Sequence, residues 1–218
     1  MQPKQTGMIF AESLVPALLS GKKVQTRRPV AGRVIDRLEG FDWLRDQEGS
    51  KQLVLAKSPF GQVGDLIYGR ETYLPDPPCD HEAWSDEDSI HFYMGWSGCG
   101  SKVKELPKRL QKPEFVIYRA TWEHDKNGLI WRPSIHMPKW ASRIWLEITR
   151  VRVELLQEIT VQDALKEGID HKTWQCPRHE YFQLWDSLYG GTQHEAGLNP
   201  LVYVYDFKLV EPPSAAAR

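Results

Sequence analysis

The spacing of apolar positions along the chain predicts short elements of both kinds. A helix is expected over residues 13–20, because Leu14, Leu18 and Leu19 share one face and Gly21 follows as a stop. Strands are expected where apolar residues run together or alternate with polar ones. These runs cover residues 53–55, 65–68, 115–120, 143–153 and 201–207.

Two further helices are expected towards the C-terminus. Thr160 and Asp163 form a variant of the capping box, and Gly168 ends the helix that they begin. An aromatic amphipathic helix follows over residues 180–189. Because the strands and helices do not alternate as regular βαβ units, we predict an α+β fold, a mixed or antiparallel sheet curled against a few helices.

The middle of the chain has a different character. Residues 74–112 lack periodicity and are rich in Pro and Gly, and residues 76–88 within them are acidic. Such a stretch predicts a long irregular insertion. We therefore expect a single domain over residues 1–211, interrupted by this insertion, and a disordered tail over residues 212–218.

Composition excludes several classes of protein. Of 218 residues, 41% are hydrophobic and 26% are charged, so the chain can bury a sizeable core. With 28 Lys+Arg against 29 Asp+Glu, it is not a polycation that coats nucleic acid. Basic stretches over residues 1–37 and 102–150 could still converge on one cleft, or they could be solvated surface.

Neither a targeting segment nor a disulfide framework is apparent. No apolar run reaches the roughly 18 residues that span a bilayer, and the N-terminus lacks the apolar region of a secretory signal. The three Cys residues are odd in number and widely spaced. We expect a cytoplasmic protein with no membrane partner.

Four residues have side chains that can bind a metal ion. Cys79 with His81, and Cys176 with His179, could supply tetrahedral zinc ligands if their loops met. The two pairs are far apart in the sequence, and neither is a double-Cys clamp. Phosphate-binding loops, dinucleotide fingerprints and Ser nucleophile elbows are also missing. We therefore predict no metal and no cofactor.

The most unusual segment is GKKVQTRRP, residues 21–29. If it is extended, alternate residues share a side: Lys23, Gln25 and Arg27 on one, and Val24, Thr26 and Arg28 on the other. Lys and Arg placed after a helix could form a site for an anion or a carbonyl group. They could equally be ordinary caps of the helix C-terminus.

The segment Gly21-x-Lys23-x-x-Thr26-x-Arg28 resembles the signature of the ASCH superfamily, which is similar to the PUA RNA-binding fold. Further segments resemble the same superfamily: residues 64–71, 164–168 and 203–207. Residues 132–143 resemble a larger subgroup associated with phages and prophages. The resemblance covers both ends and much of the middle, and leaves residues 74–112 unexplained. It implies a small mixed β-barrel flanked by helices.

The resemblance also implies an activity. Members of the superfamily include small N4-acetylcytidine amidohydrolases and some ribonucleases, and others are inferred to bind RNA. In the amidohydrolases a Lys, a Thr and a Glu act together, and these fall on Lys23, Thr26 and Glu167 here. A desolvated Lys can act as nucleophile or base, a hydroxyl can relay a proton, and Glu can protonate the leaving amine. Arg28 would hold a carbonyl or phosphate oxygen.

Five more residues are candidates for substrate binding: Glu71, His136, Trp140, Arg143 and Tyr203. Glu71 could pair with Arg28 or Lys23 and assist or replace Glu167, or form an ion pair that serves only architecture. The loop that carries His136, Trp140 and Arg143 suits stacking on a base, with Arg on phosphate. Alternatively its rings plug the mouth of the barrel.

We therefore expect a hydrolase that cleaves the amide of an N4-acylcytidine, with a nucleoside or RNA as its partner. Its cleft should lie between residues 21–28, the helix end at Gly168 and the loop 131–143. Two alternatives stay open. One is a module that binds RNA or a modified nucleotide without turnover, and the other is a ribonuclease that cuts single-stranded RNA in the same cleft.

Overall fold

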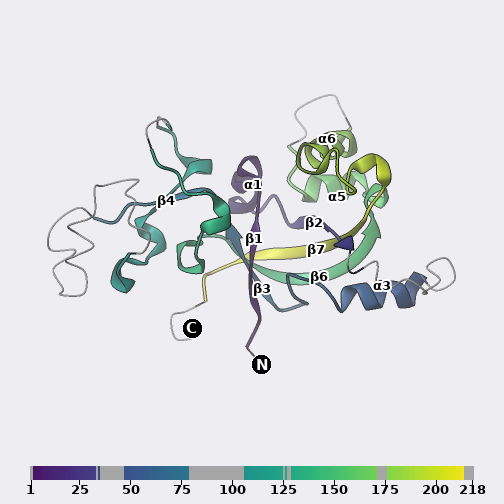
Figure 1. Cartoon of the computed structure of the whole chain (residues 1–218), viewed down its shortest axis with the longest axis horizontal. Coiled ribbons are helices and arrows are strands. Elements are labelled where there is room, and N and C mark those ends of the chain that lie inside the picture. The colour runs from purple at the N-terminus through teal and green to yellow at the C-terminus, as the bar shows by residue number, and fades with distance from the viewer. Residues whose placement is uncertain are drawn as a thin grey trace. The chain divides into compact units, whose positions relative to one another are not determined.

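The computed structural model describes residues 2–32, 34, 47–78, 106–124, 126, 129–170 and 176–213. Across these ranges the fold is mixed α+β, with a five-stranded sheet and several helices (Figure 1). The chain divides into two compact units. The first unit comprises Met1–Thr6, Ala17–Ile67 and Leu146–Glu211, and the second comprises Gly7–Pro16, Tyr68–Trp145 and Pro212–Arg218.

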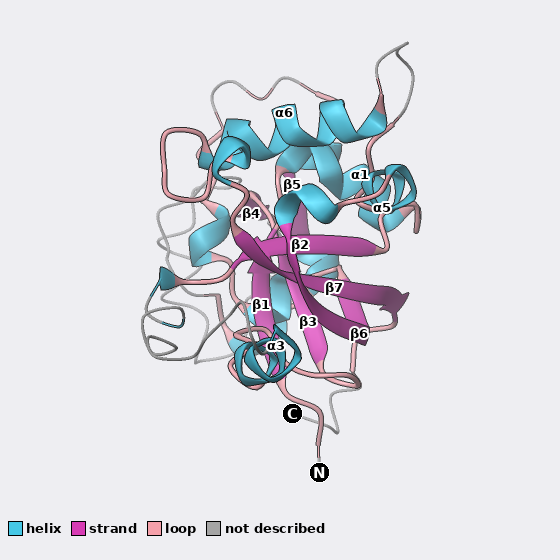
Figure 2. Ribbon diagram, turned by 90° about the vertical axis from the view of Figure 1, so that its right-hand side faces the viewer, coloured by secondary structure: helices cyan, strands magenta, loops and turns pink. Residues whose placement is uncertain are grey.

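The main sheet has the strand order β1-β3-β6-β7-β2 (Figure 2). The strands are β1 (Gln5–Ile9), β3 (Leu66–Arg70), β6 (Trp145–Leu155), β7 (Leu201–Val210) and β2 (Gln25–Pro29). Strand β2 is antiparallel to β7. The amide of Leu66 donates to Lys4 and the amide of Phe10 donates to Arg70, so β1 and β3 run in the same direction. The sheet is therefore mixed.

The expected closed barrel is not present in the described part of the chain. The ladder ends at β1 on one side and at β2 on the other, and closure would require these two edges to pair. Both edge strands have only five residues, and β2 ends at Pro29, which has no amide hydrogen to donate. A separate antiparallel pair joins β4 (Tyr73–Pro75) to β5 (Val116–Tyr118).

The helices whose bounds fall within the described residues are α1 (Val15–Leu19), α3 (Gln47–Leu55), α5 (Val161–Lys166) and α6 (Pro177–Tyr189). The strand expected at residues 53–55 is wrong, because these residues form the last turn of α3. Three adjacent apolar residues fit either a strand or a buried helix turn, and length alone cannot separate them. Helix α6 begins three residues earlier than expected, since Pro177 suits the first turn of a helix.

The cap of α5 forms as the sequence predicts. The amide of Asp163 donates to the Thr160 hydroxyl at 3.0 Å, and that hydroxyl donates to the Asp163 carboxylate at 2.7 Å. Glu167 is the C-cap of the helix, and Gly168 follows with φ +89°. Both ends of this short helix are thus fixed by local chemistry.

The core of the first unit fixes α5 on the sheet. It contains Leu156, Ile159, Ala164, Tyr181, Trp185, Ala196, Val202 and Val204. Helices α5 and α6 cover the face of β7 that carries Val202 and Val204, and α3 lies on the opposite face (Figures 1 and 2). Burial on this scale positions α5, and with it the carboxylate of Glu167.

The second unit contains β4, β5 and several short 3-10 turns, among them Ser134–His136 and Lys139–Ala141. Its core is made by Tyr73, Val116, Tyr118, Met137 and Ala141, with Trp140 packed against them. The strand expected over 115–120 is shorter than predicted, because 3-10 turns flank β5 on both sides. Most of the expected insertion, residues 79–105, and residues 214–218 of the expected tail lie outside the described residues.

Candidate functional site

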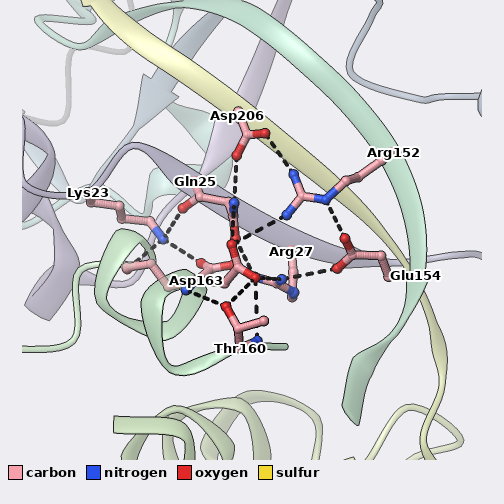
Figure 3. Close-up of polar contacts among 9 residues, drawn as sticks. Lys23, Gln25, Arg27, Arg152, Glu154, Thr160, Asp163 and Asp206 are labelled. Atoms are coloured by element: carbon pink, nitrogen blue, oxygen red, sulfur yellow. Dashed lines mark hydrogen bonds and ion pairs between the residues drawn. The ribbon is translucent and has the colours of Figure 1, made fainter. Parts of the chain in front are cut away.

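Strand β2 sends its alternate side chains to two different environments. Gln25 lies opposite Asp206 and Arg27 opposite Val204, on the face covered by α5 and α6. Thr26 lies opposite Tyr205, on the other face. The predicted sharing of one side by Gln25 and Arg27 is therefore confirmed, and a network of polar contacts forms on that side (Figure 3).

Lys23 is buried at the floor of this network, with 2% of the residue exposed. Its ammonium donates to the carbonyl of Gln25 at 2.8 Å, to the carbonyl of Glu167 at 2.8 Å and to Oε2 of Glu167 at 2.7 Å. These three bonds use every N–H of the group. Burial lowers the pKa of Lys23, and the charge and hydrogen bond of Glu167 oppose that shift.

Glu167 reaches Lys23 from the end of α5, although the two residues are 144 positions apart. Gly168 makes this approach possible. A Cβ atom at that position would lie 3.0 Å from Cβ of Lys23 and 3.1 Å from Cβ of Ala17. Its positive φ also suits glycine. The same glycine therefore ends the helix and leaves room for the Lys23 side chain.

Arg27 is a member of the network that the expected site residues did not include. Its side chain is fully buried, and it donates to Oε1 of Glu167 at 3.1 Å and to Glu154 at 3.1 Å. Glu167 thus lies between two cations, with one carboxylate oxygen on each. The period-two alternation of residues 23–28 predicts that Arg27 shares a side with Lys23. The family signature, however, includes Thr26 and Arg28 and not Arg27.

Four charged residues form the more exposed edge of the network. Their side chains are 16–24% exposed: Arg152, Glu154, Asp163 and Asp206. Arg152 contacts all three of these acids, with 2.7 Å to Asp206 and 3.6 Å to Asp163. Together with the floor, three cations face four carboxylates, so the network as a whole is not a cationic surface.

The pKa of Asp163 shows how the edge is stabilised. Burial raises it, but hydrogen bonds from Thr160 and Gln25 and the charge of Arg27 outweigh that effect, so the pKa is lowered. Gln25 donates to Asp163 at 3.2 Å and to Asp206 at 2.6 Å. The amide therefore links two carboxylates that would otherwise repel one another.

Three of the expected site residues lie on the other face of β2 and β7. Thr26 is 3% exposed and pairs in register with Tyr205, and Arg28 pairs with Tyr203. Tyr203 is 1% exposed, and its hydroxyl donates to the carbonyl of Val54 in α3 at 3.0 Å. This face is thus occupied by α3, and Tyr203 is not open to a substrate there.

The remaining candidates belong to the second unit. Glu71 pairs with Arg143 rather than with Lys23 or Arg28: two bonds of 2.9 Å join its carboxylate to the guanidinium. Burial raises the pKa of Glu71, and Arg143 offsets this only in part. The guanidinium also lies 3.9 Å from the ring centre of Tyr118. Arg143 is therefore engaged on both sides.

His136 is exposed and Trp140 is half-buried, and both line a hollow within the second unit. Of the three segments expected to form the cleft, residues 21–28 and the helix end at Gly168 lie against one another in the first unit. The third, residues 131–143, belongs to the second unit.

The structure describes only two of the four potential zinc ligands. Cys79 and His81 lie outside the described residues, Cys176 is an exposed free thiol, and His179 contacts Gln183 at 3.1 Å. Among the residues with a defined placement, no group of three or more His, Cys, Asp or Glu side chains could hold a metal ion. Over the same part of the chain, none of the helices has the length and apolar character needed to cross a membrane.

Comparison with known proteins gives a weak structural likeness. No family model and no curated protein matches the chain. An ASCH domain from Lactobacillus crispatus JV V101 is similar with a TM-score of 0.41 and 12% identity, over 96% of this chain and 81% of the other. Protein EF3133 from Enterococcus faecalis V583, of family DUF984, is similar with a TM-score of 0.40 and 10% identity, over 97% and 82%. The chain is similar in structure to these two proteins.

Proposed function

We propose that this protein is a hydrolase that removes the acyl group from N4 of an acylated cytidine, with Lys23 and Glu167 as its working pair. One observation carries the proposal. An ammonium and a carboxylate, 1% and 5% exposed, lie 2.7 Å apart at the floor of a polar network. A proton shared between such groups can be exchanged without the participation of bulk water.

The pair can carry both proton transfers of amide hydrolysis. The ammonium first passes a proton to Glu167, which gives a neutral amine and a neutral carboxyl group. Burial lowers the pKa of Lys23, which makes the loss of this proton easier than from an exposed lysine. The amine then takes a proton from water as its oxygen attacks the acyl carbon. Glu167 protonates N4 as the C–N bond breaks, which releases cytidine and a carboxylic acid and restores the ion pair.

The charge of the network supports a neutral substrate. Lys23, Arg27 and Arg152 are balanced by four carboxylates, so little positive charge is left for a phosphate. An N4-acylated nucleoside is neutral and carries an amide carbonyl. We therefore favour the free nucleoside over an RNA strand as substrate, and hydrolysis of an amide over cleavage of RNA.

Thr26 has no role in this step as proposed, because its position in the β2–β7 register turns its side chain away from Arg27 and Gln25. The same applies to Arg28, which follows on the same side of the strand. This departs from the set of three residues that the family resemblance implies. It also makes the proposal easier to test.

A second candidate function is binding without turnover. It is favoured by the complete use of the three Lys23 N–H groups, which is the arrangement of a stable ammonium in its resting state. In that case the pair would only hold the end of α5 against β2. A substrate assay separates the two functions.

The test incubates the full chain with N4-acetylcytidine and follows cytidine by chromatography. We expect release by the wild type and a loss of at least about 100-fold in Lys23→Ala and Glu167→Gln. Lys22→Ala is the matched control, because Lys22 is the exposed neighbour and should keep full activity. Thr26→Val should also remain active. Circular dichroism verifies that each variant is folded.

The contrary results are equally clear. If the wild type binds N4-acetylcytidine but releases no cytidine, the protein is a binding module. If it instead cleaves a single-stranded RNA, and Lys23→Ala abolishes that cleavage, the argument from charge is wrong. Equal activity of Lys23→Ala and Lys22→Ala would remove the Lys23–Glu167 pair from the mechanism.

A further inference from the structure

The side chain of Arg143, in the second unit, has hydrogen-bond donors that the proposed function does not use. A guanidinium carries five N–H groups, and Arg143 gives two of them to Glu71, one from Nε and one from Nη2. Two N–H groups on Nη1 and one on Nη2 remain. These three groups have no hydrogen-bond partner among the residues that the structure describes. They lie along one edge of the guanidinium, which we call the Nη1 edge.

The Nη1 edge faces solvent. The side chain of Arg143 is 23% exposed, whereas Glu71 and Tyr118, which cover another edge and one face of the guanidinium, are only 2% and 7% exposed. The exposed part of the guanidinium therefore lies away from both. Within the described ranges, Nη1 is also not one of the buried side-chain atoms that lack a hydrogen-bond partner. A dissolved ligand can thus reach these donors directly.

The guanidinium is held in place before any ligand arrives. Two bonds of 2.9 Å fix it to Glu71, and its centre lies 3.9 Å from the centre of the Tyr118 ring. Tyr118 is itself fixed, because its hydroxyl donates to the carbonyl of Ala141 at 2.8 Å. An exposed arginine loses rotamer freedom when it binds an anion, but Arg143 has already lost this freedom on folding. Binding to the Nη1 edge therefore costs less entropy than binding to an ordinary surface arginine.

The charges around Arg143 favour an anion. Glu71 neutralises Arg143, but a second group of ion pairs lies near: Glu12 contacts Arg119 and Lys126, each at 3.1 Å. The charge of Glu12 helps to raise the pKa of Glu71, so the two groups are neighbours. Among these five residues three cations meet two carboxylates, which leaves one positive charge. The network in the first unit, with three cations and four carboxylates, has the opposite balance.

We propose that the Nη1 edge of Arg143 binds the oxyanion of a small molecule, a carboxylate or a phosphate group. Two N–H groups on one edge of a guanidinium match two oxygens of either anion, as the bonds to Glu71 on the other edge illustrate. The inference does not depend on the proposed hydrolase, because Arg143 belongs to the second unit and the Lys23 network to the first.

The test titrates the full chain with sodium phosphate and, separately, with sodium acetate. NMR follows the Nε–H resonance of Arg143, assigned through its side chain to the backbone, and sodium chloride keeps the ionic strength constant. We expect a saturable shift with a dissociation constant of about 10 mM or lower for at least one of the two anions. A shift with phosphate alone would assign a phosphate group, and a shift with acetate alone a carboxylate. This measurement needs no variant.

Two variants separate the guanidinium fork from general positive charge, with the backbone amide resonance of Ile144 as the readout. Arg143→Lys keeps the charge and a donor for Glu71 but removes the planar fork, so it should weaken anion binding about tenfold or more. Lys112→Ala is the matched control. It removes a positive charge from the same unit, where Lys112 is 53% exposed and pairs with Glu114, and it should bind the anion as the wild type does.

The inference is overturned if neither anion shifts the Arg143 resonance in a saturable way, or if Arg143→Lys binds as tightly as the wild type. Equal losses in Arg143→Lys and Lys112→Ala would also overturn it, because general positive charge would then be responsible. The release of cytidine from N4-acetylcytidine, or its absence, has no bearing on these results.

Discussion

Two carboxylates in this chain are almost equally buried, but they differ in how many cations they contact and in how buried those cations are. Glu167 is 3% exposed and places one oxygen on each of two cations, Lys23 and Arg27, whose side chains are 1% and 0% exposed. Glu71 is 2% exposed and places both oxygens on one cation, Arg143, whose side chain is 23% exposed. The burial of a carboxylate therefore does not by itself predict how much stability is lost when its charge is removed. The burial of the cations that it contacts predicts this loss.

The largest expected effect follows from this difference. Glu167→Gln leaves the buried Lys23 without its counter-charge and removes one of the carboxylates that Arg27 contacts, so we expect the free energy of unfolding to fall by about 3–5 kcal/mol. Urea denaturation measures it. Glu211→Gln changes an exposed acid and should stay within about 0.5 kcal/mol of the wild type. A loss below about 1 kcal/mol in Glu167→Gln would mean that the Lys23 ammonium finds another partner.

Lys23 should make the free energy of unfolding depend on pH in the alkaline range. Its pKa is lowered in the fold from 10.5, so between the lowered value and 10.5 the unfolded chain holds a proton that the folded chain has lost. The free energy of unfolding should therefore rise with pH in this window, by about 1.4 kcal/mol for each unit of lowering. Lys23→Met should lack this rise, and the exposed control Lys22→Met should keep it. Parallel curves for Lys23→Met and the wild type would contradict the expectation.

Thr160→Ala should destabilise α5, the helix whose C-terminal end carries Glu167. The hydroxyl caps α5 and holds Asp163, so we expect a loss of about 1 kcal/mol in thermal or urea unfolding. Thr160→Ser keeps the hydroxyl and should recover most of the loss. The pKa of Asp163 should move back towards its ordinary value in the alanine variant, which carboxyl NMR titration can follow. An unchanged Asp163 titration would show that Gln25 and Arg27 suffice to hold it.

The smallest effect is expected at Glu71. Gln keeps an oxygen for Arg143, and Arg143 is near enough to water to tolerate the change, so Glu71→Gln should cost less than about 1 kcal/mol at neutral pH. The pKa of Glu71 is raised from 4.5, so the folded chain holds this proton more tightly than the unfolded chain. As pH rises from 4.5 through the raised pKa, the wild type should lose stability relative to Glu71→Gln. A relative gain over that window would mean that the Arg143 bonds outweigh burial.

The parts of the fold that depend on neighbouring residues could be predicted from the sequence. Thr160, Asp163 and Gly168 bound α5 as expected, because caps and left-handed turns act over three or four residues. The strand expected at 53–55 failed because three apolar residues carry no period. The barrel was an implication of family resemblance, and the described sheet remains open at β1 and β2.

The candidate sites depended on contacts between distant residues. Lys23 and Glu167 were named together only through the resemblance, since nothing local relates residues 144 positions apart. Arg27 was predictable as a neighbour of Lys23 from alternation, but its shared carboxylate was not. Glu71 and Arg143 were both named, yet their mutual pairing depends on how the end of β3 meets the loop before β6.

The bare backbone at Gly168 sets a limit on how the Lys23 network can vary. Even a single methyl group there would crowd the stem of Lys23 and the side chain of Ala17, at 3.0 and 3.1 Å. The turn would also have to hold an L-residue in a conformation that such residues rarely adopt. Any replacement of Gly168 would thus have to move the Lys23 ammonium and loosen the C-terminal end of α5. The position of the Lys23 side chain and the length of α5 would therefore change together.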